Sequence, residues 1–168
     1  MSEQRLSKLQ KWILENCFKV TVLLDRTALK ELNNTSRSRQ CKDCPKTSES
    51  VRVKRNQSNS IVPTCVNDGF ACTYFEFYKE DILLSFFLLT PNNDIAHFSR
   101  VQHFYDSPDY AKAHVTVHRS IKNLEEKGYI YTLSTFREDS LEIHLTDKGI
   151  EKAAELLKID DYTSLIGC

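Results

Sequence analysis

The segment His114–Ile130 reads HVTVHRSIKNLEEKGYI, and it groups more polar residues than a helix serving only the core would need. Apolar side chains fall on one helical face at steps of four, four and three residues: Ala113, Val117, Ile121 and Leu124. Cationic and hydrogen-bonding side chains occupy the middle of the helix outside that face, and Glu125–Lys127 stand at its end. The segment therefore predicts an amphipathic helix whose outward side has a binding role.

The signals for the two ends of this helix are local. Ser107 can accept hydrogen bonds from free backbone N–H groups, Pro108 suits the first turn, and Asp109 favours the positive end of the helix dipole. Gly128 is a typical residue just beyond a helix end, because glycine takes the left-handed conformation without strain. The helix is therefore predicted to run from residue 108 to residue 127.

Two β-type runs and a second helix follow. The runs YIYTLSTF (129–136) and SLEIHL (140–145) are separated by three residues, which is a typical length for a hairpin. Apolar and polar residues alternate in the second run, so one face of the hairpin is expected to be buried. Thr146 then caps a final helix, whose apolar residues share one face: Ile150, Ala153, Ala154 and Leu157.

This order of elements resembles the MarR-like winged-helix transcription regulators. In that family a helix with the pattern TV-x-R-x(4)-LE-x-x-G precedes a wing that ends in LT-x-x-G. The residues that match are Thr116, Val117, Arg119, Leu124, Glu125, Gly128, Leu145, Thr146 and Gly149. The resemblance covers roughly residues 107–157. It implies a winged helix-turn-helix fold, mainly α with a small β-hairpin wing (α+β), and a sequence-specific DNA-binding regulator of transcription.

The resemblance also implies how the chain would contact double-stranded DNA. The recognition helix, residues 108–127, would lie in the major groove with the wing, residues 130–145, beside it. Arginine can donate two hydrogen bonds to guanine, asparagine can bond adenine, threonine can contact a thymine methyl group, and lysine can hold a phosphate. The predicted DNA-binding residues are Val115, Thr116, His118, Arg119, Lys122, Asn123 and, at the wing tip, Arg137.

The composition leaves other functions open. The formal net charge is zero, whereas proteins that bind phosphates strongly are usually basic. This balance, with Glu138 and Asp139 at the wing tip, favours the alternative of a winged-helix protein–protein adaptor. A replication or partition protein of a mobile element, which would also bind DNA, is a further alternative. The sequence contains no glycine-rich phosphate loop, HExxH or Gly-x-Ser-x-Gly motif, so we do not expect an enzyme.

Length and hydropathy place the chain among globular proteins. Its 168 residues suffice for one domain or one domain with an appendage, and a hydrophobic content of 40% is enough for a packed core. No apolar run reaches the ~18 residues that a membrane-spanning helix needs. The N-terminus lacks the charged-then-apolar pattern of a signal peptide. We therefore expect a cytoplasmic protein.

Residues 6–24 predict another amphipathic helix. Its narrow apolar stripe suits either the core or contact with a second copy: Leu6, Leu9, Ile13, Cys17, Val20 and Leu24. We expect a homodimer through the first and last helices, because two half-sites on DNA require two recognition helices. The chain then divides into an N-terminal helical segment (1–32), a cysteine-containing basic insert (33–72) and a winged-helix domain with a C-terminal helix (73–168).

Shorter elements are predicted between these segments. The aromatic run at 70–78 is typical of a strand, and residues 79–89 are typical of a helix. Residues 27–32 and 95–105 each predict one more short helix. The insert between residues 33 and 68 has no sustained periodicity, so no regular element is predicted there.

Four cysteines bracket the insert: Cys41, Cys44, Cys65 and Cys72. A cytosolic chain seldom keeps structural disulfides, and a CxxC pair is typical of a metal or redox site. Seven cationic against two acidic side chains give residues 33–66 a charge of +5, and so polar a stretch cannot build its own core. A structural zinc on four thiolates would supply folding energy; an iron–sulfur cluster and free thiols are the alternatives. Cys17 is expected to be a buried small hydrophobe.

Overall fold

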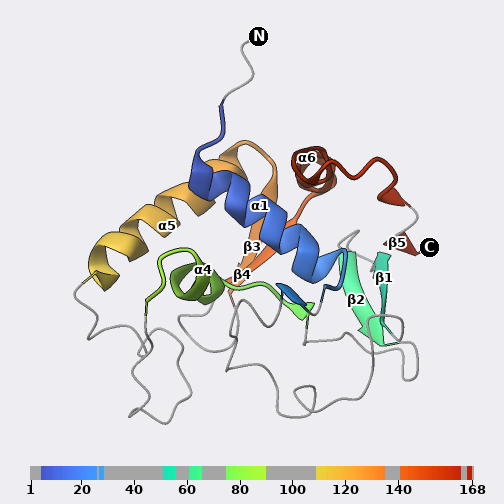
Figure 1. Ribbon diagram of the computed structural model, residues 1–168, viewed down its shortest axis with the longest axis horizontal. Helices are drawn as coiled ribbons and strands as arrows, with labels where there is room; N and C mark the ends of the chain where they lie inside the picture. The colour runs from blue at the N-terminus through green and yellow to red at the C-terminus, as the bar shows by residue number, and fades with distance from the viewer. Residues whose placement is uncertain are drawn as a thin grey trace.

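The computed structural model describes residues 5–25, 27–28, 51–55, 61–65, 75–89, 109–134, 141–163 and 166–167. In this part of the chain the longer elements are helices: α1 (Lys8–Thr21), α4 (Lys79–Ser85), α5 (Tyr110–Glu126) and α6 (Asp147–Leu157) (Figure 1). An antiparallel hairpin, β3 (Ile130–Ser134) and β4 (Leu141–Leu145), joins α5 to α6. The predicted class, mainly helical with a small β-hairpin, is confirmed.

A third segment extends the β3–β4 sheet at the other edge of β4. Tyr78 forms an antiparallel bridge with Glu142, and the backbone N–H of Ile143 donates to the Phe77 carbonyl at 2.8 Å. Because Phe77 and Tyr78 directly precede α4, this contact fixes the start of α4 against the hairpin. In the described part of the run at 70–78, which was predicted to be a strand, the pairing is limited to this bridge.

A second small sheet lies apart from the hairpin (Figure 1). Its strand order is β2–β1–β5, with β1 (Val51–Arg55) antiparallel to β2 (Ile61–Cys65) and parallel to β5 (Ile166–Gly167). The expectation that residues 33–68 hold no regular element is therefore wrong. The alternation of valine with arginine and lysine in Val51–Arg55 is a short period-two signal.

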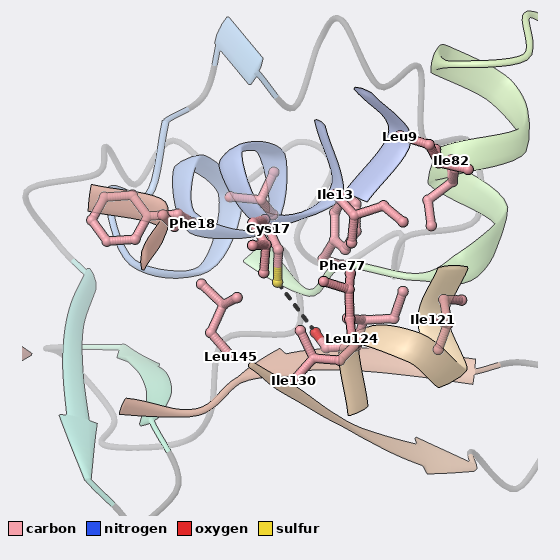
Figure 2. Packing of buried hydrophobic residues seen from close by; sticks show 14 of the residues in the cluster. Leu9, Ile13, Cys17, Phe18, Phe77, Ile82, Ile121, Leu124, Ile130 and Leu145 are labelled. Carbon is pink, nitrogen blue, oxygen red and sulfur yellow. Dashed lines mark hydrogen bonds between the residues drawn. The ribbon is translucent and has the colours of Figure 1, made fainter. Parts of the chain in front are cut away.

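Helix α1 runs through the middle of the core (Figure 2). It begins at a capping box, in which the Ser7 side chain accepts from the Gln10 backbone and the Gln10 side chain accepts from the Ser7 backbone. All six residues of its apolar stripe are buried within this one chain, where α1 packs against α5, β4 and α6. The core interpretation of this stripe is therefore confirmed. The interpretation of the stripe as a dimer surface is wrong, because the same side chains cannot face a second copy.

Three consecutive backbone carbonyls at the end of α5 accept hydrogen bonds from the start of α6, and we call this contact the joint between the two helices. The Lys127 carbonyl accepts from Lys148 Nζ at 2.8 Å, and the Gly128 carbonyl accepts from the Thr146 hydroxyl at 2.5 Å. The Tyr129 carbonyl accepts from the Thr146 backbone N–H at 3.0 Å. The first turn of α6 thus satisfies carbonyls that would otherwise have no partner where α5 ends.

Two glycines make this joint possible, each for a different reason. Gly128 has φ +77°, a left-handed conformation that side chains rarely adopt. Gly149 has no such φ, but a Cβ there would lie 1.8 Å from the Tyr129 carbonyl oxygen. One glycine therefore serves the backbone turn, and the other serves the close approach of α6.

Several helix ends differ from the predicted ones. Helix α1, predicted over residues 6–24, spans Lys8–Thr21. Helix α5 starts at Tyr110 with Asp109 in the capping position and no side-chain cap hydrogen bond. The predicted cap, Ser107, lies outside the described residues. Helix α4 ends at Ser85, earlier than predicted, because Leu88 takes a left-handed conformation (φ 54°) and the Leu89 N–H turns back to the Leu83 carbonyl at 3.0 Å. The helix predicted at 95–105 also lies outside the described residues.

Candidate nucleic-acid interface

Helix α5 has a buried side and an open side. The predicted apolar stripe is buried, together with Tyr110 at its start: Ala113, Val117, Ile121 and Leu124. Five of the predicted DNA-binding residues are exposed on the other side: Val115, Thr116, His118, Arg119 and Lys122. The separation of the two sides follows from the 3.6-residue period of the helix, and it was predicted from the spacing alone.

The cations of the open side are not neutralised within the described part of the chain. Neither Arg119 nor Lys122 forms an ion pair there, and both are exposed. The Thr116 hydroxyl donates to the Lys112 carbonyl at 3.0 Å, so its hydrogen bond lies within α5. Val115 adds an apolar side chain with 51% of its surface exposed. The open side therefore offers cations and a small apolar contact to a partner.

Asn123 was predicted to contact DNA, but the structure places it at the border of this side. It is half-buried, and its Oδ1 accepts a hydrogen bond from Gln10 Nε2 of α1 at 2.9 Å. The pair is separated by 113 residues in sequence, so periodicity within α5 could not identify it. Arg137, the predicted wing-tip contact, lies outside the described residues.

The hairpin borders the open side along the edge opposite α1. The Thr132 hydroxyl of β3 donates to Glu125 Oε1 of α5 at 2.6 Å, which ties the hairpin to the helix. This contact also occupies one of the acidic groups at the helix end. Leu133, the next residue of β3, is 50% exposed. The hairpin thus begins beside α5 with this hydrogen bond and an exposed leucine.

His114 lies on the flank of α5 that faces α4. Its Nδ1 is buried and has no hydrogen-bond partner among the described residues. Burial lowers the pKa of His114 below its usual value, and the charges of Lys79 on α4 and of His118 lower it further. The imidazole is therefore held toward its neutral form. His118, one turn later on the open side, is exposed.

The cysteine prediction falls mostly outside the described residues, which include neither Cys41, Cys44 nor Cys72. Cys65 ends strand β2, opposite Val51 of β1. Among the described residues, no group of three or more His, Cys, Asp or Glu side chains could hold a metal ion. The zinc site therefore stays a prediction.

Cys17, in contrast, is described in full. It is buried in the core, and burial raises the pKa of its thiol to about 12. Its Sγ contacts the Ile143 carbonyl oxygen at 3.5 Å (Figure 2). The prediction of a buried small hydrophobe at this position is confirmed.

Comparisons with known proteins do not assign this chain to a family. No family model, no curated protein and no solved structure matches the chain. Within its described segments, no helix has the length and hydropathy required to cross a lipid bilayer.

Proposed function

We propose that this protein is a sequence-specific DNA-binding regulator of the winged-helix type, similar to the MarR-like regulators. The order of its elements supports the proposal: α1, the Tyr78 bridge, α4, α5, the β3–β4 hairpin and α6 follow one another as helices and wing do in such domains. The observation that carries it is the open side of α5, where Arg119, Lys122 and their neighbours are exposed opposite a fully buried stripe.

The dimensions of α5 suit a major groove. Its 17 residues give a length of about 25 Å, and the groove of B-DNA is about 12 Å wide. In this placement Arg119 would donate to a guanine edge, and Lys122, one turn further along the helix, would reach a phosphate. The methyl group of Thr116 and the side chain of Val115 would contact thymine methyl groups, while β3 follows the flanking backbone.

Binding to half-sites one helical turn apart, about 34 Å, would need two copies of α5. We propose a homodimer for this reason. Because the stripe of α1 is buried, such a dimer would use another surface. Sedimentation of the free protein and of its DNA complex would measure the number of copies, and a one-to-one complex on a palindromic duplex would contradict the dimer.

The test of DNA binding starts with selection of bound duplexes from a random pool, followed by anisotropy titrations of the selected sequence. Arg119→Ala is expected to weaken binding by about 1–3 kcal/mol and to relax the preference at one base pair. Lys122→Ala is expected to weaken binding to all sequences alike. It should also reduce the salt slope, the slope of log K against log salt concentration, by about one. Lys19→Ala, at the far end of α1, is the charge-matched control.

An adaptor function has a specific observation in its favour. Val115 and Leu133 are both about half exposed, and Glu126 stands beside the cations on α5. A protein partner could bury these apolar groups, whereas phosphates would be repelled by the glutamate. If no duplex is selected, or if binding is unchanged in the Arg119→Ala and Lys122→Ala variants, the adaptor becomes the better proposal. A replication or partition protein would instead pass this test with its selected site at an origin.

A further inference from the structure

A cavity of about 620 Å³ lies between the start of α1 and the end of α5. It is a feature separate from the open side of α5, and sequence reasoning did not predict it. Four of its lining residues are cations, three carry uncharged polar groups, and none is a carboxylate: Arg5, Leu6, Ser7, Lys8, Gln10, Lys11, Asn123 and Lys127. We refer to it as the cationic pocket.

Hydrogen bonds fix Gln10, one of the residues that line the cationic pocket. Gln10 is 8% exposed, and its Oε1 accepts from the Ser7 N–H at 3.0 Å while its backbone N–H donates to Ser7 Oγ at 3.2 Å. A backbone N–H can only donate, so it must face the oxygen of the Gln10 amide. The Gln10 NH₂ group is then left to donate to Asn123 Oδ1. The orientation of both amides is thereby fixed.

This orientation leaves a donor at the pocket wall. Because Asn123 turns its oxygen to Gln10, its own NH₂ group points elsewhere, and it forms no hydrogen bond with any described residue. A pre-oriented amide donor loses little conformational entropy when it binds a ligand. The Asn123 NH₂ group can therefore donate to a molecule in the pocket.

The cations of the pocket are not explained by folding. None of Arg5, Lys8, Lys11 or Lys127 forms an ion pair in the described part of the chain. Lys8 begins α1, and its first turn contains no acidic residue, although acids are the residues that favour the positive end of a helix dipole. Four like charges around one cavity repel one another. An anion in the cavity would remove this repulsion.

We propose that the cationic pocket binds a phosphate group. Several cations and fixed amide donors around a tetrahedral oxyanion form short, charge-assisted hydrogen bonds. The phosphate has two possible sources, a free phosphorylated molecule or the backbone of a bound duplex. The second source rests on the proposed function, because Asn123 directly follows Lys122 and the pocket would then lie at the flank of the DNA-binding side.

Pyrophosphate, titrated into the full-length protein by calorimetry, tests the first source. We expect saturable binding that weakens about tenfold when Lys8→Gln and Lys11→Gln are combined. Lys19→Gln is the control, because it removes the same charge from α1 about 16 Å along the helix axis from Lys8. An Asn123→Asp variant, which places a carboxylate at the wall without changing its size, should abolish binding. Urea unfolding midpoints would show that the variants remain folded.

The salt dependence of DNA binding tests the second source. If the pocket holds a backbone phosphate, each lysine removed should lower the salt slope by about one, while Lys19→Gln leaves it unchanged. Binding of pyrophosphate supports a free ligand, and a lowered salt slope supports the duplex. If neither is found, the proposal is overturned. The pyrophosphate experiment does not depend on DNA, so it would stand even if the proposed regulator function failed.

Discussion

The two sides of α5 differ in what holds their residues in place. On the inner side Val117 and Leu124 are completely buried and share a core with α1 and the hairpin. On the outer side Arg119 and Lys122 form no hydrogen bond or ion pair within the described part of the chain. The comparison teaches that folding determines the inner residues and leaves the outer ones unconstrained. Under the proposed function, the outer residues are those that contact DNA.

Among single substitutions on the inner side, Leu124→Ala is expected to cause the largest loss of stability. Leu124 is 0% exposed, so its truncation leaves a cavity and should lower the free energy of unfolding by about 2–5 kcal/mol. The matched change on the outer side, Val115→Ala, should alter it by about 0.5 kcal/mol or less. Urea unfolding of the two variants measures the difference. Equal effects would mean that α5 is oriented differently.

The two glycines at the end of α5 are constrained for different reasons, Gly149 by the space available and Gly128 by its backbone conformation. Gly149→Ala should cost about 3 kcal/mol, since its Cβ would overlap the Tyr129 carbonyl, which is backbone and cannot turn aside. Gly128→Ala should cost about 1 kcal/mol, because its Cβ would make only an ordinary contact of 4.0 Å with the Lys148 side chain and only the positive φ is unfavourable. Thermal unfolding distinguishes the two. A Gly149→Ala protein as stable as Gly128→Ala would contradict the close packing of α6.

The outer side is tested by binding instead of stability. Combining Arg119→Ala with Lys122→Ala should leave the unfolding free energy within about 0.5 kcal/mol of the parent protein, because neither side chain has a partner in the described chain. The same double variant should lose about 2 kcal/mol or more of DNA-binding free energy. Measuring both quantities on one preparation matters. A stability loss comparable with that of Leu124→Ala would show that these cations support the fold.

The smallest expected effect compares two histidines one turn apart. The pKa of His114 lies below its usual value of 6.5, so below pH 6.5 the unfolded chain binds more protons there than the folded chain. The contribution of the neutral imidazole to stability is therefore complete above pH 6.5 and decreases as the pH falls toward the folded pKa. Urea unfolding at about pH 7.5 and about pH 5.5 measures this decrease. His114→Gln should reduce this decrease strongly. His118→Gln should reduce it only slightly, because the His118 charge is the smallest of the three causes that lower the pKa of His114.

Local signals account for what the sequence could predict. The period of α5, the glycine stop at Gly128, the hairpin and the Thr146 cap each depend on residues within a few positions of one another, and all four are confirmed. The start of α1 has a local signal as well, the Ser7-x-x-Gln10 capping box, which places the first helical residue at Lys8.

Long-range contacts account for what it could not. The choice between core and dimer surface for the α1 stripe, the Gln10–Asn123 hydrogen bond and the cationic pocket each depend on residues far apart in the chain. No periodicity within one segment contains that information. Strand β1 was missed for another reason: its five residues are too short a run to stand out in a polar segment, and Pro63 weakens the strand signal of β2.

The three carbonyls that α6 receives from the end of α5 have a mechanical consequence. Lys148 and Thr146 donate hydrogen bonds to successive residues of the turn after α5. Gly149 allows α6 to pack directly against this turn. The two helices are thereby mechanically coupled, so that a tilt of one helix would be transmitted to the other. A molecule that bound α6 would therefore act on α5 without contacting its open side.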